Sequence, residues 1–268
     1  MSHQHRAAAA DGTSIAWSRT GTGPPVILVH GITESATAFD PVIERLSSGN
    51  SVITLDLRGH GESGRSEAYD LAAMATDVAA VIAAAGVDRP HLVGHSLGGA
   101  VVTAAGSMLD VASVVDIDQS LQLGEFKEQL ASAEAMLRDP EQYQLVVDAM
   151  FEMMMGDVLD ASEARRINSL RRADHEVVLG AWELLLTQPV EEIAAAIDAA
   201  LAGYAGRAVP YLALFGLDPG DGYGSWLADR IPGAEVEYWA DGDRPFGHYP
   251  HLIDPDRFVA RLRRFWDG

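Results

Sequence analysis

The heptapeptide Val93–Gly99, which reads VGHSLGG, constrains the fold of this chain more than any other stretch. The hydrophobic run His91–Val93 leads into it and the helix-prone run Ala100–Leu109 follows, which predicts a strand, a tight turn and a helix with Ser96 at the apex. The glycines beside the serine are needed because a Cβ there would collide with the neighbouring strand and helix. The unpaired N–H groups of the helix start favour negative charge next to the serine.

The composition is that of an acidic globular protein. The 268 residues are 48% hydrophobic, which is enough for one α/β domain with an insertion and argues against disorder. The formal net charge is −20 and Lys127 is the single lysine, so the surface repels nucleic acid and anionic membranes. We therefore expect a small-molecule substrate and neither nucleic acid nor a membrane as partner. The composition leaves the oligomeric state open.

The residue types that are missing narrow the chemistry further. There is no cysteine, which excludes disulfides, thiolate catalysis and zinc–thiolate sites. The glycines of 94–99 form neither Gly-x-Gly-x-x-Gly nor a phosphate-binding loop with its lysine, so we expect no cofactor and no metal. The segment Met1–Arg6 is polar and lacks the apolar region of a secretory signal, and no stretch is apolar enough to span a membrane. These features favour a cytoplasmic protein.

Hydrophobic runs alternate with helix-prone runs on both sides of the serine turn. This alternation predicts an α/β fold with a doubly wound, mostly parallel sheet and right-handed crossovers. Asp11-Gly12 predicts a hairpin at one edge of the sheet. The predicted parallel strands are 26–29, 52–57, 91–93, 111–117, 209–215 and 235–239, and the helices between them include 37–46, 71–85 and 223–230.

The alternation stops in the middle of the chain. From about Leu121 to Tyr204 no convincing strand occurs, and the pattern predicts four or five helices. Asp139-Pro140-Glu141 has the residues of a helix start, and Gln188-Pro189 those of a helix end. We expect residues 1–120 and 205–268 to form the core, with 121–204 inserted as a helical block.

In this context the Gly-x-Ser-x-Gly turn resembles the nucleophile elbow of the α/β-hydrolase family. The resemblance runs from Pro24 to the C-terminus and includes the His30-Gly31 pair and the glycine turn Arg58–Ser63. It implies a catalytic triad in the chain order Ser, Asp, His, and a helical cap that covers the active site. Within the glycine turn, Arg58 and Glu62 are expected to fix the conformation and not to take part in catalysis.

The resemblance makes Ser96 the nucleophile and a histidine after the last strand its base. A serine hydroxyl needs such a base, because it is a weak nucleophile near neutral pH. Two histidines follow the last strand: His248, directly after a glycine as in the family, and His251. We expect His248 to be the base and His251 to be structural. His95 and His60 are expected to make local hydrogen bonds.

The carboxylate that orients the base has three candidates. Asp218 follows the strand that ends at Phe215 and is the expected acid, although Gly216-Leu217-Asp218 is one residue shorter than the family's usual spacing. Asp221 is the nearest alternative. Asp118 ends the preceding strand, where some relatives carry their acid.

Two backbone N–H groups are expected to form the oxyanion hole. The resemblance assigns one to Leu97, the residue after the nucleophile, and the other to Ile32, which follows His30-Gly31. Their side chains are then free to line the acyl pocket. Glu34, just beyond, is expected to be a solvated loop charge.

These residues predict a serine hydrolase that cleaves a small, largely apolar ester, thioester or lactone through an acyl-enzyme. One alternative is that the same triad serves C–C hydrolysis, a lyase reaction or cofactor-free perhydrolysis. Another is a small-molecule receptor with slow or no turnover, suggested by the short acid loop and the long loop 241–246 before His248. Most of the apolar side chains of 121–204 are expected to form helix-to-helix core, with one or two facing Ser96.

Overall fold

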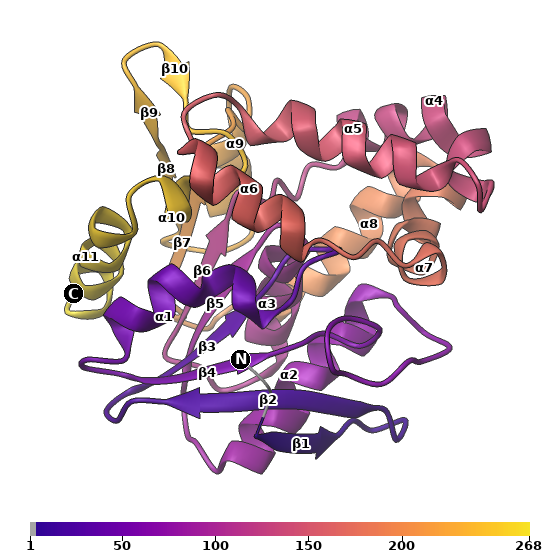
Figure 1. Cartoon of the computed structure of the whole chain (residues 1–268). Helices are drawn as coiled ribbons and strands as arrows, with labels where there is room; N and C mark the ends of the chain where they lie inside the picture. The colour runs from indigo at the N-terminus through magenta and orange to yellow at the C-terminus, as the bar shows by residue number, and fades with distance from the viewer. Residues whose placement is uncertain (1–3) are drawn as a thin grey trace.

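The computed structural model describes residues 4–268 and is built around one eight-stranded sheet (Figure 1). The strand order is β1-β2-β4-β3-β5-β6-β7-β8. The strands are β1 (His5–Ala8), β2 (Ser14–Thr20), β3 (Pro25–Val29), β4 (Ser51–Leu55), β5 (His91–His95), β6 (Ser113–Ile117), β7 (Tyr211–Phe215) and β8 (Glu235–Tyr238).

The sheet is mostly parallel, and the prediction of a doubly wound α/β fold is confirmed. In the order of the sheet, neighbouring strands from β4 to β8, including β3, are parallel. Strands β1 and β2 form the antiparallel hairpin expected at Asp11-Gly12. Every residue of β4, β6 and β7 is buried, as expected for strands covered on both faces. The register pairs His95 with Ile117 and Ile117 with Leu214, so β5, β6 and β7 end side by side.

Helices cover both faces of the sheet. On one face α1 (Asp40–Leu46) packs against α11 (Pro255–Trp266). The short helix η1 (Ala36–Phe39) precedes α1 in the chain, and the turn α10 (Pro250–Ile253) precedes α11. On the other face lie α2 (Leu71–Ala85), α3 (Leu97–Met108) and α9 (Tyr223–Ala228). Asp254 caps α11 by accepting a hydrogen bond from the Arg257 N–H, as the Asp-Pro start signal predicts.

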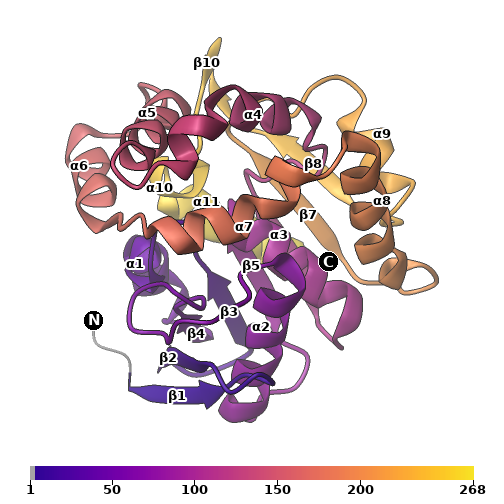
Figure 2. The same ribbon diagram turned by 90° about the vertical axis from the view of Figure 1, so that its right-hand side faces the viewer.

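Five helices between β6 and β7 lie above the carboxyl ends of the strands (Figure 2). They have their own apolar core, which includes Leu130, Val147, Val178 and Ile193. They are α4 (Gly124–Arg138), α5 (Tyr143–Met155), α6 (Ala161–Leu170), α7 (His175–Thr187) and α8 (Val190–Leu201), followed by the short helix η2 (Ala202–Tyr204).

Two local features differ from the sequence-based prediction. Asp139 does not begin a helix: α4 ends at Arg138, and the Asp139 carboxylate accepts a hydrogen bond from the Glu141 N–H in a turn before α5. An aspartate makes such a turn with its own chain two residues on, so the same residue suits a turn and a helix cap. The long segment before His248 forms a small hairpin of β9 (Ala240–Asp241) and β10 (Arg244–Pro245).

The expectation for Met1–Arg6 concerns a segment whose first three residues lie outside the described range. Within residues 4–268, no helix combines the length and the apolarity needed to cross a lipid bilayer.

Candidate active site

Ser96 sits in a strained turn between β5 and α3. Its φ of 53° and ψ of −126° place a non-glycine residue in a sparsely populated region, as the predicted elbow requires. The turn is closely packed, because a Cβ on Gly94 would lie 2.0 Å from the Gly98 carbonyl oxygen. A Cβ on Gly98 would lie 2.2 Å from the carbonyl oxygen of Val29. Both glycines are therefore required by the lack of space for a side chain.

The carboxylate that contacts the expected base belongs to Asp118. Its Oδ2 lies 2.6 Å from Nδ1 of His248, and both side chains are buried. The expectation that Asp218 holds this imidazole is therefore wrong for the structure. Asp218 is exposed and accepts a hydrogen bond from the Gly220 N–H, and Asp221 is exposed as well.

The end of the neighbouring strand holds the Asp118 carboxylate in place. Its Oδ1 accepts hydrogen bonds from the N–H groups of Gly216 at 2.7 Å and Leu217 at 2.8 Å. The backbone of Asp118 has a φ of 54°, so this residue, like Ser96, is strained. Strain at a non-glycine residue is kept where surrounding contacts determine the conformation, and it is frequent at functional sites.

One ring nitrogen of His248 makes no hydrogen bond to the described residues. Within residues 4–268, its Nε2 is buried and has no hydrogen-bond partner, while Nδ1 contacts Asp118. His248 and Ser96 line the same cleft. The His248 N–H donates to the Met154 carbonyl oxygen at 2.9 Å, which ties the segment to α5. His251 is fully buried and packs against Phe39, and it does not line the cleft.

The expected oxyanion segments lie beside the serine. A Cβ on Gly31 would be 3.1 Å from the Ser96 Cβ, and Ile32 and Leu97 line the cleft together with Ser96. Thr33 follows with a φ of 67°, another strained position in this region.

Two buried histidines hold the segment after β3 against the glycine turn. His30 Nε2 accepts a hydrogen bond from the Leu57 N–H at 3.0 Å. His60 Nε2 accepts one from the Thr33 N–H at 3.2 Å, and its Nδ1 lies 3.0 Å from the Arg58 carbonyl oxygen. His60 thus makes local hydrogen bonds, as expected.

Glu34 is not the solvated charge that the sequence suggested. It is 3% exposed, and its carboxylate bridges the segment after β3 and the segment that carries His248. One oxygen accepts from the Gly31 N–H at 3.2 Å and the other from the Tyr249 hydroxyl at 2.8 Å. His95 completes this cluster: its Nδ1 lies 3.4 Å from Glu34, and its Nε2 donates to the His248 carbonyl oxygen at 2.7 Å.

The cluster favours charge on both Glu34 and His95. Burial alone would raise the pKa of Glu34, but the nearby His95 and the Tyr249 hydroxyl outweigh it and hold that pKa well below its usual range. Burial would likewise lower the pKa of His95, but Glu34 and the His248 carbonyl raise it. Burial and the charge of His95 lower the pKa of His251 well below its usual range, so this imidazole is neutral.

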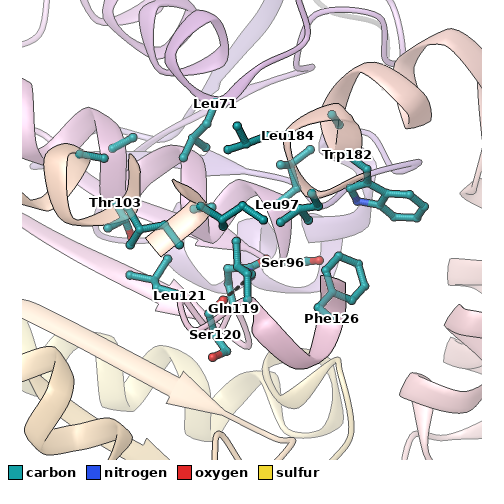
Figure 3. A pocket seen from close by; sticks show the side chains of 18 of the residues that line it. Leu71, Ser96, Leu97, Thr103, Gln119, Ser120, Leu121, Phe126, Trp182 and Leu184 are labelled. Carbon is teal, nitrogen blue, oxygen red and sulfur yellow. Dashed lines mark hydrogen bonds between the residues drawn. The ribbon is translucent and has the colours of Figure 1, made fainter. Parts of the chain in front are cut away.

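A cleft of about 1140 Å³ lies between the sheet and the inserted helices, with Ser96 and His248 in its wall. Figure 3 shows Ser96 between Thr103 on one side and Phe126 and Trp182 on the other. Most of the lining is apolar. The lining residues contributed by the inserted helices include Phe126, Met150, Phe151, Met154, Trp182, Leu184 and Leu185.

A buried arginine anchors the loop at the rim of this cleft. Arg58 is 1% exposed and forms a two-pronged ion pair with Asp77 at 2.6 and 2.8 Å. It also donates to Asp11 and to the Ala68 carbonyl oxygen. Arg58 therefore fixes the turn as expected, whereas the Glu62 side chain pairs with Arg6 at the surface.

Sequence reasoning named Asp118 but preferred Asp218, and it did not predict that Glu34 is buried. The departure of Gly216-Leu217-Asp218 from the family's usual spacing was the available signal against Asp218. For Glu34 no local pattern distinguishes a buried carboxylate, since its partners His95 and Tyr249 are distant in the chain.

Residues 26–261 match the model of the alpha/beta hydrolase family. Among curated proteins, an uncharacterised protein of Mycobacterium tuberculosis is 27% identical, with 92% of this chain and 76% of that protein covered. A 2-(acetamidomethylene)succinate hydrolase of Mesorhizobium japonicum is 43% identical over 101 residues, covering 37% of this chain and 36% of that enzyme.

Solved structures of esterases are similar over nearly the whole chain. An esterase from Exiguobacterium antarcticum superposes with a TM-score of 0.80 at 19% identity, with 100% of each chain covered. An esterase from a Rhodococcus species superposes with a TM-score of 0.73 at 28% identity, with 98% of each chain covered.

Proposed function

Because this chain belongs to the alpha/beta hydrolase family, we propose that it is a serine hydrolase acting on a largely apolar carboxylic ester, thioester or lactone. Ser96 is the nucleophile, His248 the base and Asp118 the acid that orients the base. The observation that carries the proposal is the 2.6 Å contact between Asp118 and His248 Nδ1, which leaves Nε2 available on the wall shared with Ser96.

In the proposed reaction, His248 Nε2 takes the hydroxyl proton as Ser96 Oγ attacks the substrate carbonyl carbon. The N–H groups of Ile32 and Leu97 stabilise the oxyanion. The bond to the leaving group then breaks, and the leaving group takes the proton from His248. Water, activated by the same imidazole, cleaves the acyl-enzyme and regenerates Ser96.

The geometry around Asp118 also supports turnover over the alternative of a receptor. That alternative arose from the short loop at Asp218, and the structure pairs His248 with a different carboxylate that accepts two backbone N–H groups. Esterase structures of the same fold, the Rhodococcus enzyme at 28% identity among them, are consistent with ester hydrolysis.

Hydrolysis of p-nitrophenyl butyrate by wild type and by Ser96→Ala tests the proposal. We expect kcat to fall by a factor of about 10³ or more in the variant, because the nucleophile is lost. Tyr238→Phe, an exposed position outside the cleft, is the matched control for hydroxyl loss and should keep wild-type activity. Equal rates in wild type and Ser96→Ala would refute the assignment.

A further inference from the structure

The cleft continues well past Ser96 along one face of α3. Ala100, Ala104 and Ser107 line it, at spacings of four and three residues that put them on the same side of the helix. A helix rises about 1.5 Å per residue, so the lining from Leu97 to Ser107 extends about 15 Å. Between Leu97 and Met108, which line the two ends of this face, the α3 side chains that line the cleft are small.

The opposite wall of this part of the cleft comes from α8 and η2. The small residues Ala196, Ala200 and Gly203 line it together with the apolar side chains of Ile193, Ile197 and Leu201. The two walls meet at the far end, because a Cβ on Gly203 would lie 2.2 Å from the Ser107 carbonyl oxygen. In Figure 3 Thr103 and Leu121 lie on this side of Ser96, opposite the aromatic rings of Phe126 and Trp182. The cleft therefore has an elongated apolar part between α3 and α8 in addition to the aromatic part near Phe126 and Trp182.

Several acidic side chains line the cleft. Within residues 4–268, its lining includes the carboxylates of Glu67, Asp70, Glu183 and Asp218 in addition to Asp118, and no lysine or arginine. The chain as a whole carries a formal charge of −20. A phosphate-bearing group would be repelled here and would find no cation to bind.

From these observations we propose that the substrate is uncharged and carries a long, unbranched apolar chain that lies along α3. A C–C bond of about 1.5 Å advances an extended alkyl chain by about 1.3 Å per carbon, so about 15 Å accommodates about twelve carbons. The inference rests on the proposed serine hydrolase function and narrows its substrate class. On this inference the preferred substrates are neither small acetate-like esters nor thioesters of coenzyme A.

The first experiment measures kcat/KM for p-nitrophenyl acetate, butyrate, octanoate and dodecanoate. Burial of a methylene raises the specificity constant by up to about fourfold, so we expect a rise of at least about tenfold from butyrate to octanoate. A matching series of alkyl acetates tells whether the chain enters on the acyl or the alcohol side. Length preference in either series supports the inference, and a preference for the shortest member in both overturns it.

Filling the far part of the cleft tests where the chain lies. Ala200→Trp, on the α8 wall, should lower the ratio of dodecanoate to acetate turnover at least tenfold, and Ala104→Leu on the α3 wall should lower it in the same direction. Ala195→Trp is the matched control, because Ala195 lies on the same helix, is exposed and does not line the cleft. Thermal melting confirms that each variant is folded. An unchanged ratio in a folded Ala200→Trp protein contradicts the inference.

The charge argument has its own test. We expect the decanoyl thioester of N-acetylcysteamine, which is neutral, to react at least tenfold faster than decanoyl-coenzyme A at low ionic strength. Added salt should reduce the difference between the two rates, because it screens the carboxylates. Equal or faster turnover of the coenzyme A thioester would overturn this part. Absence of Ser96-dependent turnover with every ester is instead a failure of the proposed function itself.

Discussion

Asp116 and Asp118 lie two residues apart at the end of β6, yet their surroundings differ sharply. Asp118 contacts His248 and accepts two backbone N–H groups. Asp116 is fully buried, its Oδ1 has no partner within the described residues, and the Tyr211 hydroxyl is 3.4 Å from its Oδ2. Burial first, and then the neighbouring Asp118, raise the pKa of Asp116 well above its usual range.

The stability of the Asp116→Asn variant relative to wild type should therefore increase as the pH rises. The raised folded-state pKa means that Asp116 supports folding below about pH 4, the unfolded value, and loses this contribution as the pH rises toward the folded value. Asparagine does not titrate, so the melting temperature of Asp116→Asn relative to wild type should rise between pH 4 and pH 8. About 2–4 °C is expected for each kcal/mol recovered.

Activity provides the control for this variant. Asp116→Asn should keep wild-type kcat, because the residue does not contact His248. A melting-temperature difference that stays constant from pH 4 to pH 8 would show that Asp116 is ionised in the folded protein.

At the scale of elements, the connection between β4 and α2 depends on the ion pair between Arg58 and Asp77. Asp77 is on the buried face of α2, and Arg58 reaches it from the glycine turn. The same guanidinium holds the Ala68 carbonyl oxygen, next to residues that line the rim of the cleft. Removing one partner would leave a charge buried without compensation, whereas removing both would not.

Arg58→Met should accordingly lower the free energy of unfolding by about 3–5 kcal/mol in urea titrations. The double variant Arg58→Met/Asp77→Leu should recover much of this loss. Arg65→Met is the matched control, because Arg65 pairs with Glu176 and Asp174 at the surface and should cost at most about 1 kcal/mol. A loss in Arg58→Met no greater than that in Arg65→Met would contradict the account.

At the scale of the whole molecule, the sequence predicted the sheet well because its signals are local. Runs such as 52–57 and 209–215 are mostly apolar, and the observed strands Ser51–Leu55 and Tyr211–Phe215 overlap them. Helix Leu71–Ala85 has the predicted bounds, with Asp70 capping its start and Gly86 ending it in a left-handed conformation. The failure at Asp139 arose because one aspartate suits both a turn and a helix start.

The candidate site was predicted only as far as each residue's neighbours in the chain determine it. The turn at Ser96 follows from its own glycines, and His248 follows from Gly247. The partner of His248 depends instead on which of two adjacent strand ends faces it, and β6 and β7 end side by side. Sequence spacing does not contain information on which strands are neighbours, so the carboxylate that contacts His248 was predicted on the wrong strand.

The central claim is that folding aligns Ser96, His248 and Asp118, and labelling of Ser96 by a fluorophosphonate probe tests it most directly. The rate is measured by intact mass for wild type, Asp118→Asn and Asp218→Asn. We predict equal labelling of Ser96 in wild type and Asp218→Asn, and labelling slower by about 10² or more in Asp118→Asn, because the imidazole loses its orienting carboxylate. Slow labelling in Asp218→Asn with wild-type labelling in Asp118→Asn would contradict the account.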